Sequence, residues 1–104
     1  MYKHIILFKF QTSVSTAEAL ELLHQLGELK DKIPGIVKYS YGKNDGDNTH
    51  NLGFEYAFVM EFSSKQDRDA YQINEHHQTF INETLNSAIS EAIVFDMVVA
   101  EEER

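Results

Sequence analysis

The chain of 104 residues contains no cysteine and a single proline. The absence of cysteine excludes disulfides, thiolate metal sites and cysteine nucleophiles together. The longest apolar runs are far shorter than the roughly 20 residues that a membrane span requires. The first residues alternate as a strand does and do not resemble a basic region followed by an apolar signal segment. We therefore expect a cytoplasmic protein without a membrane partner.

Basic residues are also scarce, because nine lysines and arginines face 17 acidic side chains and leave a net charge of −8. No stretch rich in lysine or arginine breaks this balance, so the surface should repel nucleic acid and anionic lipids. The chain has no phosphate loop, dinucleotide fingerprint, serine nucleophile elbow or zinc-ligand spacing. We expect no cofactor and no dedicated metal site, while a weakly held divalent ion at the Asp-rich loop after residue 43 is left open.

The apolar residues, 42% of the chain, follow two clear periods. Alternation predicts strands, and recurrence every three to four residues predicts helices. The predicted elements are a strand at 2–10, a helix at 15–33, strands at 37–42 and 54–62, a short helix at 64–71, a second helix whose stripe is Ile81, Leu85, Ala88 and Ile89, and a strand at 92–99. This order predicts a ferredoxin-like α+β fold, βαββαβ, with a four-stranded antiparallel sheet and its helices on one face, in one domain over residues 1–104.

The strands at 2–10 and 54–62 carry large apolar side chains on both faces. In a ferredoxin-like fold the helices cover one face and leave the other bare, over an area on the order of 500 Å². A patch of that size lies near the upper limit of what monomers expose. We therefore predict a homodimer packed sheet against sheet, a dimeric α/β barrel. The alternative is a monomer with a curled sheet around a filled cavity.

Tyr71 and His77 are the acid/base pair that this chain offers. Asn74 is a good N-cap residue, and if it caps a helix then His77 occupies the third helical position. The positive end of the helix dipole would there lower the pKa of His77, whereas Glu75 would raise it. A neutral imidazole at this position could act as a general base.

A helix break at Asn74 is what would allow the two side chains to converge. On one continuous helix six residues turn by about 600°, which places Tyr71 and His77 on poorly matched faces. Once converged, Tyr71 could donate a hydrogen bond to an enolate oxygen while His77 accepts a proton from carbon. In the structural alternative, Tyr71 packs on the sheet and His77 bonds to nearby backbone. His4, on an apolar strand face, is a further catalytic candidate or a buried core or interface residue.

Several segments along the chain are similar to those of one known family. They are Lys3-His4-Ile5-Ile6-Leu7-Phe8-Lys9-Phe10, Ile33-Pro34-Gly35-Ile36, Gly42-Lys43-Asn44, Gly53-Phe54-Glu55-Tyr56-Ala57-Phe58-Val59-Met60-Glu61-Phe62, the residues Tyr71, His77 and Phe80, and Val94-Phe95-Asp96. Their order and spacing over residues 2–97 resemble the stress-responsive A/B barrel (Dabb) proteins, which are dimeric α+β barrels. The resemblance implies the same fold and self-association for this chain.

The resemblance also implies site residues, because one plant branch of the family is associated with cofactor-free polyketide cyclisation. The tyrosine and histidine that act in that branch match Tyr71 and His77, and the histidine of its first strand matches His4. The chain departs from the family at Asn74-Glu75-His76-His77, where His-Pro-x-His is common. It also has Leu26 and Tyr56 where the cyclising branch has a tyrosine and a histidine.

Three functions are compatible with these observations. The first is a small dimeric binding protein with an apolar pocket that includes Phe8, Tyr56 and Phe80 and takes a small aromatic or polyketide-like ligand. The second is a cofactor-free enzyme of the polyketide cyclase or lyase type with Tyr71 and His77 as acid and base. The third is a structural or stress-protective oligomer without a ligand.

Overall fold

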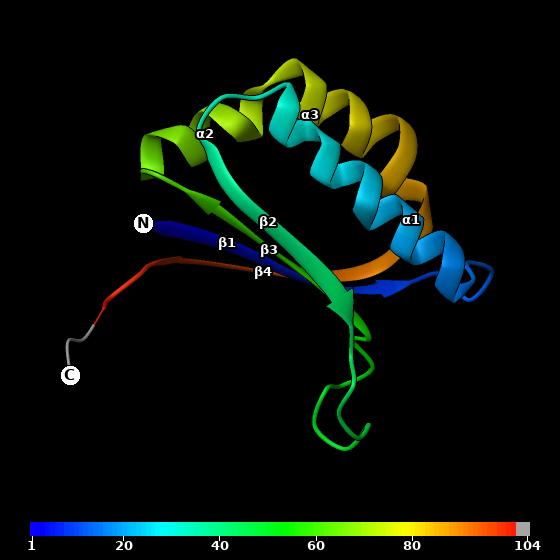
Figure 1. Cartoon of the computed structure of the whole chain (residues 1–104). Coiled ribbons are helices and arrows are strands. Elements are labelled where there is room, and N and C mark those ends of the chain that lie inside the picture. Colours follow the sequence, from blue (N-terminus) through cyan, green and yellow to red (C-terminus); the bar gives the residue numbers. More distant parts are fainter. Residues whose placement is uncertain (102–104) are drawn as a thin grey trace.

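The computed structural model describes residues 1–101 and consists of a sheet with a layer of helices on one side (Figure 1). Its strands and helices are β1 (Tyr2–Phe10), α1 (Thr16–Gly27), η1 (Glu28–Asp31), β2 (Ile36–Lys43), β3 (Tyr56–Phe62), α2 (Lys65–Ile73), α3 (Glu75–Phe80), η2 (Ile81–Leu85), η3 (Asn86–Ala88) and β4 (Ile89–Val98). The segments η1 and η3 are 3₁₀ turns, and η2 is a π-helical turn. The βαββαβ order predicted from the sequence is confirmed.

The sheet has the strand order β2-β3-β1-β4, and every neighbouring pair is antiparallel. The helices cover one face, and the opposite face is left open (Figure 1). The core lies between the two layers, where Leu23 and Leu26 of α1 pack with Phe58 and Met60 of β3. The even-numbered residues of β1 point into this core, and Tyr2, His4 and Phe8 are buried there.

Two predicted boundaries are wrong by three residues or more. The first helix is α-helical to Gly27 and then tightens into the 3₁₀ turn η1, although Leu29 and Ile33 still reach the core. Ile89, assigned to a helical stripe, opens β4 and pairs with Phe10. The short turn η3 ends the helix at Ala88, so the chain is extended three residues earlier than predicted. A 3₁₀ turn commonly ends a helix in this way.

Gly27 breaks the regular pattern of the first helix for a reason that only the packing reveals. The ring of Tyr39 on β2 lies so close that a Cβ added at Gly27 would approach its Cδ2 at 2.7 Å. The Tyr39 hydroxyl donates a 2.6 Å hydrogen bond to the carbonyl of Leu23. Because Gly27 has no side chain, Tyr39 of β2 can pack directly against α1. This contact offsets the low helix propensity of glycine.

The helical layer breaks at Asn74, as the sequence predicts. Asn74 has extended backbone angles, with φ −65° and ψ 137°, and its side chain accepts a hydrogen bond from the His76 amide. The chain then restarts as α3 and widens into the π-helical turn η2. Turns of this kind are frequent beside functional sites. The break and the turn together decide how the side chains of this layer face β1 and β4.

Candidate functional site

Tyr71 and His77 lie against one another beneath the helical layer. Their ring centroids are 4.2 Å apart, with an angle of 44° between the ring planes. Tyr71 is 1% exposed and also packs on Phe62, at a centroid distance of 5.3 Å. The break at Asn74 thus brings together the two residues expected to converge, while their chemical roles remain a prediction.

The hydroxyl of Tyr71 forms no hydrogen bond with any other residue within 1–101. Among residues 1–101 the fully buried side-chain polar atom without a partner is Oδ1 of Asn51, so the Tyr71 hydroxyl keeps some accessible surface although its side chain is almost fully buried. Burial raises the pKa of Tyr71 above its ordinary value, because an ionised phenolate would be desolvated. The hydroxyl therefore keeps its proton at neutral pH and is free to donate it to a bound acceptor.

His77 has one ring nitrogen held by the backbone. Its Nδ1 lies 3.1 Å from the carbonyl oxygen of Gln72, which can only accept a hydrogen bond. Nδ1 therefore carries the hydrogen, and in the neutral ring Nε2 has the free lone pair. Burial lowers the pKa of His77, the Gln72 hydrogen bond opposes this effect, and nearby His4 adds to the lowering. The predicted direction agrees with the structure, but the main cause is burial and not the helix dipole.

The pair borders a cavity of about 190 Å³ between the sheet and the helical layer. Most of its lining is apolar, and the polar side chains among its residues are Tyr71, His77 and Asn86. The complete lining is Ile6, Phe8, Leu26, Phe58, Tyr71, His77, Ile81, Leu85, Asn86, Ile89 and Ala92. Asn86 and Ala92 are exposed, so the cavity opens between η3 and the edge strand β4.

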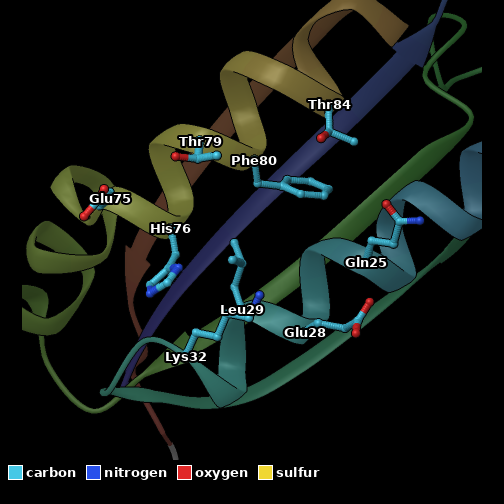
Figure 2. A pocket seen from close by; sticks show the side chains of 9 residues that line it. All are labelled: Gln25, Glu28, Leu29, Lys32, Glu75, His76, Thr79, Phe80 and Thr84. Atoms are coloured by element: carbon cyan, nitrogen blue, oxygen red, sulfur yellow. The ribbon is translucent and has the colours of Figure 1, made fainter.

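The three aromatic residues predicted to share a pocket line three different hollows. Phe8 lines the cavity beside Tyr71. Tyr56 lines a hollow of about 400 Å³ next to the 44–55 loop, and its ring packs on Phe10 on the helix-covered face. Phe80 lines a hollow of about 460 Å³ between η1 and α3, where Figure 2 shows its ring extending from α3 toward α1. The three rings therefore border separate hollows, although Phe8 and Tyr56 are paired neighbours on the same face of the sheet and both pack on Phe10.

His4 belongs to a chain of polar side chains that crosses three elements. It is 3% exposed, and its Nδ1 lies 2.5 Å from Oδ1 of Asp96 on β4. The second carboxylate oxygen of Asp96 accepts a hydrogen bond from Nη1 of Arg68 on α2, also at 2.5 Å. The guanidinium of Arg68 lies over the ring of Tyr2, 5.1 Å from its centroid. The His4 ring contacts the Tyr71 ring edge to face, with a distance of 6.2 Å between the ring centroids. The row of polar side chains from Arg68 to His4 therefore packs against the candidate site through Tyr71.

Sequence reasoning missed the roles of Arg68 and Asp96. A signal for Asp96 was present, since it is a lone acidic residue in the apolar run 92–99. Antiparallel pairing of the first and last strands places it opposite His4. Arg68 had no comparable signal, because its side chain reaches Asp96 from a helix 28 residues earlier.

The described part of the chain contains neither a metal-binding cluster nor a helix that could span a membrane. Within residues 1–101 no group of three or more histidine or acidic residues could hold a metal ion. None of the helices in this part of the chain is long and apolar enough to cross a bilayer.

The chain belongs to the stress-responsive A/B barrel domain family, whose profile matches residues 2–99. No curated protein matches it in sequence. Similar solved structures include an Arabidopsis thaliana protein with a TM-score of 0.90 and 22% identity, where each chain is covered completely. A hydroxynitrile lyase from Passiflora edulis has a TM-score of 0.85 and 18% identity, with 99% of this chain and 96% of that chain covered.

A third relative bears on assembly. It is a dimeric ferredoxin-like protein of unknown function from Jannaschia, with a TM-score of 0.77 and 21% identity over 94% of this chain and 98% of that chain. At these identities the likeness shows the fold. Self-association is thus a property of structural relatives of this chain.

The lowered pKa of His77 makes the stability of the protein depend on pH. The ordinary pKa of histidine is about 6.5, so between this value and the lower pKa of folded His77 the unfolded state binds more protons. We expect the free energy of unfolding to be highest above this window and to fall as the pH decreases through it. Urea denaturation at several pH values measures this, with His77→Gln removing the dependence and His76→Gln, as a control, retaining it. An NMR titration placing His77 above pH 6.5 would contradict the prediction.

Proposed function

We propose that this protein binds a small, largely apolar carbonyl compound in the cavity beside Tyr71. The observation that carries the proposal is the Tyr71 hydroxyl, which has no hydrogen-bond partner within residues 1–101 and belongs to an almost fully buried side chain that lines the cavity. This hydroxyl is free to donate a hydrogen bond into the cavity, and a carbonyl oxygen of a ligand would accept it. An engineered cavity of about 150 Å³ accommodates benzene, so about 190 Å³ suits a ligand with one ring and a short chain.

A second candidate function, cofactor-free proton transfer on the same ligand, is favoured by the state of His77. Its Nδ1 is held by Gln72, and its lowered pKa keeps Nε2 available as a base near neutral pH. Nε2 would take a proton from the carbon next to the carbonyl, and Tyr71 would donate a hydrogen bond to the resulting enolate oxygen. The enolate could be reprotonated or could attack a second carbonyl. One structural relative is a hydroxynitrile lyase, which supports a lyase type of chemistry without specifying it.

His4 would act on this chemistry through its neighbours. Asp96 accepts the Nδ1 hydrogen of His4, which sets the orientation of the ring that packs against Tyr71. His4 does not line the cavity. We therefore assign His4 a positioning role toward Tyr71 in this proposal, in place of direct contact with the ligand.

We further propose that the protein forms a homodimer through the open face of its sheet. Strand register places Ile5, Leu7, Ala57, Val59, Ile93 and Phe95 side by side on that face. Ion pairs border the apolar centre at its two ends, Lys3 with Glu61 at 3.9 Å and Lys9 with Glu91 at 3.4 Å. An apolar centre with a charged rim is typical of protein interfaces.

The cytoplasmic location expected from the sequence is also a proposal.

The test is a thermal-shift screen with small aromatic ketones and diketones, followed by NMR. In D₂O, proton abstraction would replace hydrogen by deuterium at the carbon next to the carbonyl of a ligand found in the screen. We expect Tyr71→Phe, which removes only the hydroxyl, to weaken binding by roughly twofold to tenfold. His77→Gln should slow the exchange by about 10² or more while binding persists.

The outcomes separate the candidate functions. Binding that depends on Tyr71 without deuterium exchange would support a binding protein. Exchange lost in His77→Gln would support catalysis. Tyr71→Phe with unchanged affinity for every ligand would reject the site, and a screen without ligands would favour the structural oligomer.

A further inference from the structure

Asn86 occupies the mouth of the cavity that Tyr71 borders. It lies on η3, between the π-helical turn and β4, and is exposed together with Ala92 across the opening. Within residues 1–101 its side-chain amide forms no hydrogen bond, although the amide has two donor hydrogens and an acceptor oxygen. It is therefore free to bind the part of a ligand that remains at the opening.

The two polar regions of the cavity lie at different points along β1. Tyr71 packs beside His4, whereas Ala92 pairs with Phe8 and Ile89 pairs with Phe10. His4 and Phe8 are four residues apart on this extended strand, so they are separated by roughly 13 Å along it. The lining between these two positions is apolar, with Ile6 and Phe58. A ligand that reaches both ends needs two polar groups separated by an apolar segment about as long as a ring with a short chain.

The charge of the distal group also follows from the lining. Among the described residues no lysine or arginine lines this cavity, so a carboxylate or phosphate at the mouth would lack a cationic partner. The asparagine amide both donates and accepts, which suits a hydroxyl or an amide. The acidic net charge of the chain, −8, further disfavours an anionic group.

We propose that Asn86 is a specificity-determining residue of this cavity, which selects ligands carrying a neutral hydroxyl or amide group at the end opposite the carbonyl. The inference rests on the proposed binding function. It defines the ligand class as carbonyl compounds with one ring and a distal neutral hydrogen-bonding group.

The test compares the affinities of three matched ketones by isothermal titration calorimetry: benzylacetone, para-hydroxybenzylacetone and para-carboxybenzylacetone. We expect the wild type to bind the hydroxyl compound roughly threefold to tenfold more tightly than benzylacetone, as one hydrogen bond provides. The carboxylate should bind more weakly than the hydroxyl compound. Asn86→Leu should remove the preference for the hydroxyl and leave the affinity for benzylacetone within about twofold. Asn82→Leu, a change at an exposed residue of η2 outside the cavity lining, should behave as the wild type.

Three results would overturn the inference in distinguishable ways. If Asn86→Leu keeps the hydroxyl preference, or if the wild type has none, Asn86 does not set specificity while the binding function stands. If the carboxylate binds best, the distal group is anionic and the stated ligand class is wrong. If none of the three ketones binds the wild type, the proposed carbonyl site fails and the inference fails with it.

Discussion

Asp96→Ala is expected to lower the free energy of unfolding by about 3 kcal/mol, the lower end of the cost of removing one partner from a charged cluster that is largely shielded from water. The substitution would leave Nη1 of Arg68 and Nδ1 of His4 without the carboxylate that both contact. The side chain of His4 is 4% exposed, and those of Arg68 and Asp96 are 12% and 22% exposed, so water replaces the lost interactions only in part. Urea denaturation at one fixed protein concentration measures the loss.

The chain contains a matched control for this experiment. Arg68 also donates a hydrogen bond to Asp69, whose side chain is largely exposed, at 3.0 Å. Removing an exposed partner generally costs between 0 and about 1 kcal/mol, so Asp69→Ala should have a small effect. If Asp96→Ala costs no more than Asp69→Ala, the polar chain from Arg68 to His4 does not stabilise the fold.

Phe95→Lys is expected to convert the proposed dimer into a monomer, with a dissociation constant raised at least about 100-fold. Phe95 is 56% exposed and pairs with Ile5 in the centre of the open face. A two-fold axis would place the substitution in the interface twice, and each buried ammonium would lack a partner. Analytical ultracentrifugation over a concentration series gives the dissociation constant directly.

Val94→Lys on the same strand is the control for the interface. Val94 is 54% exposed, nearly the same as Phe95, but its neighbour on β1 is Ile6, on the face that the helices cover. We expect this variant to dimerise like the wild type. Equal loss of association in both variants would contradict the open-face interface and place it at the edge of β4. A wild type that is monomeric at every concentration would reject the dimer itself.

Part of the candidate site could be predicted from local sequence. Asn74 is an N-cap residue, and the Tyr71–His77 spacing suits a broken helix, so the convergence of these two rings followed from local rules. For the pKa of His77, the sequence predicted the direction of the shift but not its cause. The pKa is lowered mainly by burial, and the nearby His4 adds to the lowering. The sequence contains no local signal for how deeply a side chain of the helical layer is buried.

Long-range contacts account for the features that sequence reasoning missed. The chain from Arg68 through Asp96 to His4 joins α2, β4 and β1, and depends on one strand register. The close contact of Gly27 with Tyr39 depends on how α1 lies on β2. In both cases the interacting residues are far apart in the chain, so neither periodicity nor spacing indicates that they meet.

The sequence by itself determined the order of the elements, the antiparallel sheet with its helices on one face and the helix break at Asn74, because alternation, helical spacing and capping act between residues close in the chain. Only the tertiary structure decided which side chains share a cavity. It separated Phe8, Tyr56 and Phe80 into three hollows and brought Asn86 to the mouth of the one beside Tyr71. The physical reason is that a cavity is the space left where helices and sheet pack, and this packing depends on all the contacts of the fold together.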